Sequence, residues 1–332
     1  MANRVLSHET LLSLVIPMYN EEPVLGKLFE RLDLVVQSLP VRVEVVLVND
    51  GSRDRTLEIA TAQVQRNPVY RVINLSRNFG HQMAVSAALS LVRGDVVAII
   101  DADLQDPPEL LMPMLERWRD GVDVVYGQRR ERKGETRFKL ITASLFYRFL
   151  SKMTTTNIPR NTGDFRIMDR RLVLALNNMP EQHRFLRGMV AWLGYRQEPF
   201  LYDRDPRVDG ETKYPLKKMI AFSLDAIFSF STKPLHWMSI LGFGMTFFGI
   251  VAAIIWVILR LAFPHLFVHG VVSILVTVWF LFGVNFLCLG VLGEYLGRVF
   301  INVQGRPHYI IHEVISAESF LPAETTDTEK DG

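Results

Sequence analysis

The hydrophobic pattern of the first 130 residues changes repeatedly between two periods. Short apolar runs rich in Val, Ile and Leu recur, and between them apolar residues return every three or four positions. The short runs predict strands at 11–18, 43–48, 70–75, 96–100 and 123–127, and the stretches between them predict helices at 22–39, 56–65, 81–92 and 108–118. Strands that alternate with helices in this way predict an α/β fold, in which right-handed crossovers cover both faces of a mainly parallel sheet.

After residue 235 the pattern becomes continuously apolar. Trp237–Leu259 and Val271–Gly293 contain no charged residue. At ~1.5 Å per residue each is long enough to cross a hydrocarbon core of about 30 Å, so the sequence predicts two transmembrane helices. The loop 260–270 is too short for a domain, so the helices should form a hairpin with both ends on one side. Basic residues near those ends, against Arg260 alone in the loop, predict that the ends are cytoplasmic: Lys213, Lys217, Lys218, Lys233, Arg298 and Arg306.

Two further stretches combine bulky apolar residues with Lys or Arg. These are 138–152 and 214–230, which fit helices lying in the headgroup layer of a membrane, with a buried core helix as the alternative for each. The predicted organisation is therefore a water-soluble first domain at 1–212, a juxtamembrane amphipathic helix at 213–233, two transmembrane helices within 234–298 and a C-terminal tail at 299–332. The acidic and polar end of the tail, 316–332, is predicted to be disordered.

Composition and charge indicate the compartment. The 332 residues are 49% hydrophobic and carry a formal net charge of +2, which suits one or two domains with a sizeable core. The single cysteine, Cys288, excludes a disulfide framework and indicates a reducing compartment. Residues 1–10 are polar and lack the apolar core of a signal peptide. We therefore expect a multi-pass protein of the inner (plasma) membrane whose first domain, 1–212, is cytoplasmic.

An acidic hexapeptide follows the strand predicted at 96–100. It reads Asp101-Ala-Asp-Leu-Gln-Asp106. Side chains two apart on an extended chain point the same way, which would direct Asp101 and Asp103 together into the crevice at the carboxyl end of the sheet. Their oxygens, with Gln105 two residues on, suit Mg²⁺ or Mn²⁺ that takes its other ligands from water and a diphosphate. The alternative is an acidic loop that caps the next helix, with Asp106 as the N-cap.

The other strand ends on this edge are also polar. Tyr19 and Glu21 follow the first strand, Asn-Asp50-Gly51-Ser the second, and 76–81 the third. Such loops supply hydrogen bonds for a base and a ribose, and Asp50 could accept from either. Asn-Asp-Gly-Ser is equally a good turn, in which Gly51 takes a positive φ. The strands are followed by no Gly-x-Gly-x-x-Gly fingerprint and no P-loop, which argues against a dinucleotide enzyme.

A strongly basic stretch follows the strand predicted at 123–127. Six of the eleven residues from 129 to 139 are cationic: Arg129, Arg130, Arg132, Lys133, Arg137 and Lys139. Arginine forks match phosphate oxygens two at a time, so we expect phosphate binding. Glu131 and Glu135 are interleaved, which leaves a solvated surface as the alternative. Nucleic acid is not an expected partner, because no aromatic stacking residues are interleaved and the net charge is small.

Three motifs carry a resemblance to a known family. They are Val15-Ile-Pro-Met-Tyr-Asn-Glu21, Asp101-Ala-Asp-Leu-Gln-Asp-Pro-Pro-Glu109 and Gly293-Glu-Tyr-Leu-Gly-Arg298. With them the chain resembles the polyprenyl-phosphate glycosyltransferases of family 2, which include dolichol-phosphate mannose synthase and the bactoprenol glucosyltransferases. The resemblance implies a GT-A catalytic domain, a Rossmann-like mainly parallel sheet, followed by interfacial helices and a two-helix transmembrane hairpin.

The same resemblance implies roles for individual residues. The nucleotide would be contacted by Pro17, Tyr19, Glu21 and Asp50, and Mg²⁺ or Mn²⁺ would be held by Asp101, Asp103 and Gln105. The phosphates would face Arg129, Arg132 and Arg137. Asp164, within Gly163–Arg166, falls where the family places a carboxylate near the donor sugar. Whether Asp164 acts as a base or orients the sugar hydroxyls is open, since an ionised phosphate acceptor needs no strong base.

The function that these residues and the resemblance imply is that of an inverting hexosyltransferase. It would move one sugar, glucose from UDP-glucose as the first choice, onto undecaprenyl phosphate in the lipid bilayer. Alternatives are GDP-mannose with a dolichyl or polyprenyl phosphate, or a UDP-amino-arabinose donor. Processive synthases carry Gln-x-x-Arg-Trp, and Gln182-His-Arg-Phe185 does not fit that motif, which favours single-sugar transfer. A hypothesis of another class is a non-catalytic, nucleotide-sensing membrane scaffold. A homo-oligomer is left open.

Overall fold

The computed structural model describes residues 4–130, 162–182, 184–203, 233–262 and 271–320. It divides into two compact units, each considered by itself below. One unit holds Met1–Lys139, Ile158–Lys213 and Pro307–Gly332, and the other holds Leu140–Asn157 and Tyr214–Arg306. The two predicted interfacial helices, 138–152 and 214–230, lie outside the described residues.

The first unit is built on one eight-stranded sheet with the order β7-β5-β6-β4-β1-β2-β3-β8. The strands are β1 (Leu11–Met18), β2 (Arg42–Asn49), β3 (Tyr70–Leu75), β4 (Val96–Ile99), β5 (Val124–Arg129), β6 (Thr162–Asp169), β7 (Gln197–Tyr202) and β8 (Ile311–Ile315). The central strands β4, β1, β2 and β3 are parallel, and β5 is parallel to β7. β6 is antiparallel to both β4 and β5, and β8 is antiparallel to β3. The predicted mainly parallel sheet is confirmed.

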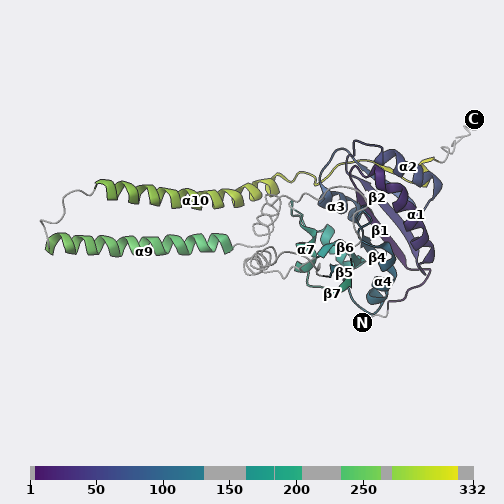
Figure 1. The fold of residues 1–332 in the computed structure, drawn as a ribbon, viewed down its shortest axis with the longest axis horizontal. Helices are drawn as coiled ribbons and strands as arrows, with labels where there is room; N and C mark the ends of the chain where they lie inside the picture. The colour runs from purple at the N-terminus through teal and green to yellow at the C-terminus, as the bar shows by residue number, and fades with distance from the viewer. Residues whose placement is uncertain (1–3, 131–161, 183, 204–232, 263–270, 321–332) are drawn as a thin grey trace, which may run out of the picture. The chain divides into compact units, whose positions relative to one another are not determined.

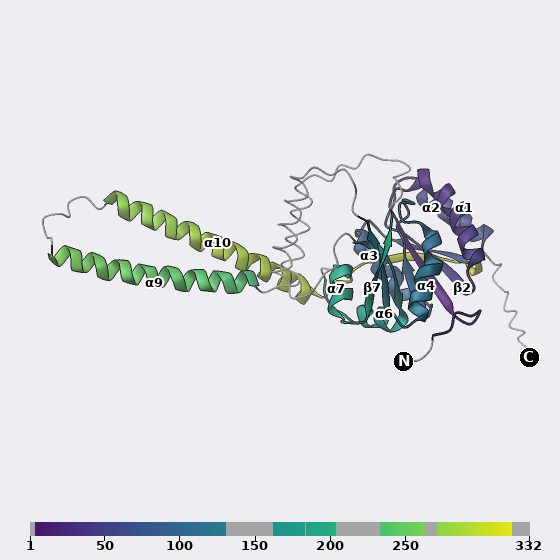
Figure 2. The same cartoon turned by 60° about the horizontal axis from the view of Figure 1, so that its bottom comes forward.

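Helices lie on both sides of this sheet (Figures 1 and 2). They are α1 (Glu22–Ser38), α2 (Thr56–Arg66), α3 (His81–Leu91), α4 (Leu111–Arg119), α6 (Arg170–Asn177) and α7 (Leu186–Trp192), with a 3-10 turn, η1 (Pro108–Leu110), ahead of α4. Alternate residues of β1, such as Leu12, Leu14 and Ile16, are fully buried in one core with the apolar faces of α1, α2 and α4. The period-2 and period-3.6 patterns thus meet in the same hydrophobic core.

The predicted strands and helices up to residue 129 are confirmed, with boundaries that differ by one or two residues. The strands β6, β7 and β8 were not predicted from the sequence. In β6 the charged residues Asp164, Arg166 and Asp169 are buried among apolar ones, so the strand has no hydrophobic alternation to reveal it. The C-terminal segment returns to the sheet as β8 and continues into a 3-10 helix, η2 (Ala317–Phe320), so the prediction of disorder is wrong for residues 317–320. Residues 321–332 lie outside the described part.

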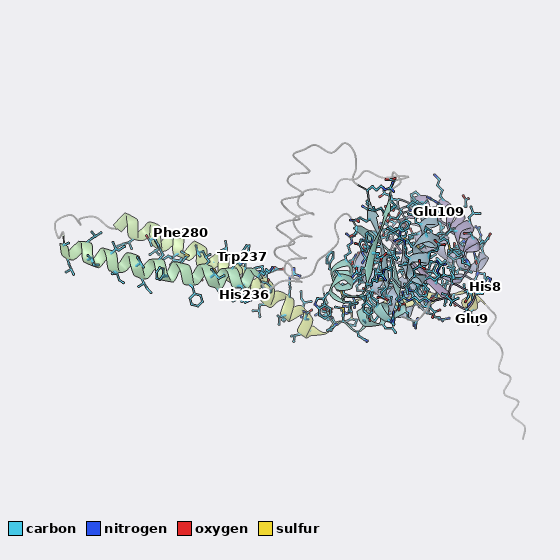
Figure 3. All side chains as sticks on the ribbon, turned by 90° about the horizontal axis from the view of Figure 1, so that it is seen from below. His8, Glu9, Glu109, His236, Trp237 and Phe280 are labelled. Carbon is cyan, nitrogen blue, oxygen red and sulfur yellow. The ribbon has the colours of Figure 1, made fainter. Side chains whose placement is uncertain are left out.

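The second unit contains two long apolar helices, α9 (Lys233–Ala262) and α10 (Val271–Gln304). Within them, Lys233–Val251 and Thr277–Gln304 are long and apolar enough to cross a membrane, and none of either segment's most apolar stretch is buried. Figure 3 shows the side chains along both helices, including Trp237 and Phe280, which are 53% and 63% exposed. Exposed apolar surface on this scale is unfavourable in water and normal in lipid.

Candidate active site

Asp101 lies where three strands converge at the carboxyl end of β4. In the ladder registers Val15 pairs with Ile99 and Arg166 pairs with Ile99. Continuing both registers by two residues places Asp101 between Pro17 of β1 and Asp164 of β6. The last ladder bond on the β1 side runs from Ile100 N to Val15 O at 3.0 Å. The next would need an amide N–H at Pro17, which proline lacks, so the ladder ends before Asp101.

The chain turns immediately after that point. β4 ends at Ile99, residues 102–104 form a turn and bend, and Leu104 has a φ of 57°. Gln105 N donates to Asp103 Oδ1 at 3.1 Å, which closes the turn. The expectation that Asp101 and Asp103 share a face because the chain is extended is therefore wrong. A turn, rather than a strand pleat, brings the two carboxylates to the same loop.

Asp106 has a different role from the helix cap considered above. The N-cap position of η1 is Pro107, and no side chain caps it. Asp106 is 1% exposed, and its Oδ1 accepts a hydrogen bond from the Tyr202 hydroxyl of β7. Burial and this bond to Asp106 raise the pKa of Tyr202. Asp106 thus fastens the acidic loop to β7, so the helix-cap alternative is wrong.

The environment of Asp101 favours a positive partner. The side chain of Asp101 is 27% exposed, but its Oδ1 is buried and accepts no hydrogen bond from the described residues. Burial, opposed by the charge of His81 and reinforced by the negative charges of Asp164, Asp106 and Asp103, raises the pKa of Asp101 to about 6. Like charges this close disfavour one another's ionisation, and a cation relieves that repulsion.

These observations fit a divalent cation held by Asp101 and Asp103. A buried carboxylate oxygen without a hydrogen bond is available as a ligand, and the neighbouring carboxylates need a counter-charge. In the described part of the chain no three His, Cys, Asp or Glu residues converge as a metal site. Two carboxylates are still sufficient for Mg²⁺ or Mn²⁺, because such ions take water and substrate phosphate oxygens as their remaining ligands. Gln105, 7% exposed, is buried in the same loop.

Asp164 is the most heavily bonded carboxylate of the site. It is 5% exposed and lies on β6. Arg187 of α7 donates to it twice, from Nε at 2.9 Å and from Nη2 at 3.2 Å. His81 Nε2 lies 3.1 Å from Asp164 Oδ2, and Gln82 Nε2 donates to the same oxygen at 3.1 Å. Burial alone would raise the pKa of Asp164, but the bonds to His81 and Arg187 and the charges of Arg187 and Arg166 hold it well below 3.8.

His81 connects the two carboxylates. It is the first residue of α3, and its Nε2 lies 3.7 Å from Asp101 Oδ1 as well as 3.1 Å from Asp164. Burial lowers the pKa of His81, but the bond to Asp164 and the two negative charges outweigh burial and raise it above 6.5. The neighbouring Gln82 accepts a bond from Leu186 N at 3.1 Å through Oε1. Gln82 therefore ties the start of α7, and with it Arg187, to the same cluster.

Asp50 is buried and joins two loops rather than facing solvent. Its two oxygens accept from Phe79 N at 2.7 Å and from Gly80 N at 2.9 Å. Burial raises the pKa of Asp50 and these backbone bonds oppose it. The turn alternative for this loop is confirmed at Gly51, which has a φ of 65°; a Cβ there would lie 2.5 Å from Arg77 C. Both the turn and a nucleotide contact from Asp50 remain compatible with this geometry.

Four further predicted residues, Pro17, Tyr19, Glu21 and Arg129, lie on or near the same edge. Tyr19 is 42% exposed, Glu21 is half-buried at the start of α1, and Pro17 is buried. Arg129 lies at the end of β5, where it bonds the Tyr202 side chain and has its guanidinium beside Gly163. The structure therefore brings Arg129 next to the residue preceding Asp164. Arg132 and Arg137 lie outside the described residues.

Several residues of this cluster were not recognised from the sequence. His81 was seen only within a polar loop, and Gln82, Arg166 and Arg187 were not singled out for any role. Arg166 is 5% exposed and donates to the carbonyls of Asp164 and Gly163, and burial lowers its pKa to about 10. A local signal for Arg187 is absent, because it reaches Asp164 only after β6 and α7 have packed.

Comparison with protein families gives a consistent picture. The family model described as glycosyl transferase family 2 matches residues 13–176. The chain is 46% identical over 313 residues to an uncharacterised glycosyltransferase of Synechocystis, covering 94% of this chain and 98% of the relative. It is 37% identical to the bactoprenol glucosyl transferase of Shigella phage SfII, covering 90% of this chain and 97% of that protein.

A homologue in Escherichia coli and solved structures extend the comparison. The prophage bactoprenol glucosyl transferase homolog of Escherichia coli is 36% identical, over 91% of this chain and 99% of that protein. Among solved structures, mannosyl-3-phosphoglycerate synthase from Rubrobacter xylanophilus is 19% identical with a TM-score of 0.45, covering 66% of this chain and 72% of that one.

Proposed function

The chain belongs to glycosyltransferase family 2, and from this premise we propose that it transfers a single hexose from a nucleotide sugar to a polyprenyl phosphate. UDP-glucose and undecaprenyl phosphate are the proposed donor and acceptor. The names of the relatives at 36% and 37% identity support the acceptor and the sugar. The observation that carries the proposal is the buried, unbonded Oδ1 of Asp101, which lies among carboxylates at the carboxyl end of a parallel sheet.

In the proposed reaction an oxygen of the lipid phosphate attacks the anomeric carbon in line. The new C–O bond forms as the bond to the nucleoside diphosphate breaks, UDP leaves, and the configuration inverts. A phosphate monoester has a second pKa of about 6, so its attacking oxygen is largely ionised at neutral pH. No protein group has to remove a proton from it.

The acidic loop would bind the donor diphosphate. Asp101, Asp103 and Gln105 are the proposed ligands of Mg²⁺ or Mn²⁺. When bound, that ion would neutralise charge on the departing diphosphate. Pro17, Tyr19, Glu21 and Asp50 are proposed to contact the nucleotide, and Arg129, Arg132 and Arg137 the phosphates. Cations placed before the reaction reduce repulsion between two anionic reactants and orient them.

We assign Asp164 to positioning rather than to proton removal. A carboxylate whose pKa is held well below 3.8 is a weak base. Its four hydrogen bonds hold Arg187, His81 and Gln82 in fixed orientations around the donor site. Through these partners Asp164 would shape the pocket in which the sugar hydroxyls lie.

The membrane part of the proposal concerns the second unit. Two helices long and apolar enough to span a bilayer would place the site near the headgroups, where a lipid phosphate is available. We propose that the catalytic domain, residues 1–212, is on the cytoplasmic side of an inner (plasma) membrane. The juxtamembrane segment 213–233 would lie on that membrane, 234–298 would cross it, and 299–332 would return to the cytoplasm.

The test is a transfer assay with purified full-length protein. It would be given undecaprenyl phosphate and, in separate reactions, UDP-glucose, GDP-mannose and a UDP-amino-arabinose, and the organic phase would be analysed by mass spectrometry. Addition of a single hexose to the lipid in the reaction with UDP-glucose supports the proposal. If the lipid is glycosylated only with another donor, that donor replaces UDP-glucose in the proposal. If no glycosylated lipid appears with any donor, the proposal that the protein transfers a sugar to undecaprenyl phosphate is wrong, and the hypothesis of a nucleotide-sensing scaffold gains support.

A further inference from the structure

The segment that follows the second apolar helix is an integral part of the catalytic sheet. β8 pairs antiparallel with β3, and Asn74 lies opposite Glu313 in the register. Ser76 N donates to Ile310 O at 2.9 Å, and the Tyr309 hydroxyl donates to Ser90 Oγ at 2.9 Å. The strand β8 therefore forms the edge of the sheet beside β3. The carboxyl end of β3 leads into the loop 76–80, whose backbone N–H groups donate to the Asp50 side chain.

A chain of side-chain hydrogen bonds runs inward from this edge. Asn74 Nδ2 donates to Glu313 Oε1 at 3.0 Å. Asn49 Nδ2 donates to Asn74 Oδ1 at 2.9 Å, and Ser52 N donates to Asn49 Oδ1 at 3.2 Å. Asn49 and Asn74 are 2% and 8% exposed, whereas Glu313 is exposed. One exposed carboxylate is thus linked through two buried amides to the backbone of the loop after β2.

The chemistry of these groups gives the chain one direction. An ionised carboxylate only accepts hydrogen bonds, so the Asn74 amide must turn its NH₂ towards Glu313 and its oxygen towards Asn49. Asn49 must then turn its NH₂ towards Asn74, which leaves its oxygen facing Ser52 N. If the Asn74 amide were reversed, its NH₂ would face the Asn49 NH₂, and if the Asn49 amide were reversed, its NH₂ would face the Ser52 N–H. In either case two donors would meet in a buried site.

The orientation of Asn49 matters because of what Ser52 holds. Ser52 Oγ accepts from Asn20 N at 3.0 Å, and Arg53 N donates to Asn20 Oδ1 at 2.8 Å. Asn20 has a φ of 56°, a left-handed conformation that depends on such local bonds. Tyr19 directly precedes Asn20, and Asp50 directly follows Asn49; both are assigned to the donor nucleotide above. The bond chain from Glu313 therefore ends at the two loops that would bind the donor.

We propose that Glu313 is a positioning residue for the donor-nucleotide site and acts by fixing the orientation of the Asn74 and Asn49 amides. This inference rests on the proposed function for the identity of the site, but the bond chain itself lies in the ligand-free fold. It gives the strand that follows the apolar helices a role in donor binding. Glu313 touches no reacting atom in this scheme.

The test uses one disruptive variant, one rescue and one matched control, all in full-length protein. Glu313→Lys replaces the acceptor with a donor and should reverse both amides. Glu313→Lys combined with Asn74→Asp should restore the chain, because the carboxylate introduced on β3 accepts both from the ammonium introduced on β8 and from Asn49. Glu318→Lys makes the same change of charge at an exposed residue of η2 and is the control.

Two readouts separate this inference from the proposed function. Amide hydrogen exchange of residues 50–53 in ligand-free protein should be about tenfold faster in Glu313→Lys, near wild type in the double variant and unchanged in Glu318→Lys. UDP affinity in the presence of Mn²⁺ should weaken about tenfold in the single variant and recover in the double one. Unchanged exchange in Glu313→Lys, or a double variant as impaired as the single one, overturns the inference. If the variants show the expected changes in hydrogen exchange but the wild type does not bind UDP, the assignment of the nucleotide site is overturned instead.

Discussion

Replacing Asp164 with Asn tests whether the central carboxylate of the site is a structural anchor or a base. Asparagine keeps the shape of the side chain and removes its charge. In the native protein that charge faces the Arg187 guanidinium at 2.9 Å and the Arg166 guanidinium at 3.8 Å. Arg166 is 5% exposed and cannot turn to solvent without disturbing the sheet. The variant therefore leaves buried positive charge without its partner.

The cost follows from the burial of the partners. Removing one member of a buried ion pair destabilises a protein by about 3–5 kcal/mol. Arg187 has 28% of its side chain exposed and can partly rehydrate, so the lower end of that range, about 3 kcal/mol, applies here. For a unit of this size 1 kcal/mol corresponds to about 2–4 °C, which gives a Tm lower by roughly 6–12 °C.

The assay is thermal unfolding of the detergent-solubilised protein followed by near-UV circular dichroism. The matched control is Asp120→Asn, since the Asp120 side chain is 60% exposed and its ion pair is with the neighbouring Arg119; its Tm should stay within about 1 °C. Transfer activity is measured in parallel across about pH 6–9. Asp164→Asn should lower activity. It should also lower the pKa of His81, because the bond to Asp164 is the largest influence that raises it, so a limb of the pH profile that depends on His81 should move to lower pH.

The opposite pattern would refute this reasoning. A variant with wild-type Tm and no measurable transfer would mean that Asp164 acts on the reactants directly, as a base or as a ligand of the sugar. Wild-type values of both Tm and activity would mean that the hydrogen bonds around Asp164 contribute little.

Three further predictions concern the metal loop, the turn after β2 and the acid stability of the sheet. Asp103→Ala should abolish transfer and shift Tm by no more than about 2 °C, as should chelation of divalent ions; full activity in either case removes the metal role. Gly51→Ala should lower the free energy of unfolding by at least about 1–3 kcal/mol in denaturant titrations, because its φ is 65° and a Cβ would lie 2.5 Å from Asn78 N; a wild-type midpoint would contradict this. Burial raises the pKa of Asp169, but bonds from Arg171 and the charge of Arg4 outweigh burial and lower it below 3.8. The stability advantage of the wild type over Asp169→Asn should therefore be complete above about pH 4 and disappear as the pH falls through the lower folded-state pKa, and an advantage that persists unchanged at about pH 2 would contradict the assignment.

Local sequence patterns were sufficient to predict the scaffold of the donor side. Strands and helices up to residue 129 each have their own local period, so they could be predicted from spacing alone. The same holds for α9 and α10, because their long uncharged runs predict membrane-spanning helices without information about the rest of the fold. The acidic loop was also located by its residue types and by its place after a buried strand. Pro17 was recognised from the sequence as part of a motif. That it ends the hydrogen-bond ladder beside Asp101 could not be predicted, because this depends on the register of β1 with β4.

The rest of the site depends on contacts between segments that are far apart in the sequence. Asp164 contacts His81 because β6 enters the sheet antiparallel to β4, and Arg187 contacts Asp164 because α7 packs against the same cluster. Buried charges removed the alternation that would have revealed β6. β8 was equally unpredicted, since a five-residue edge strand derives its pairing from β3, which lies far earlier in the chain. Local patterns report on a residue's own turn or pleat, whereas these contacts depend on which distant strands become neighbours.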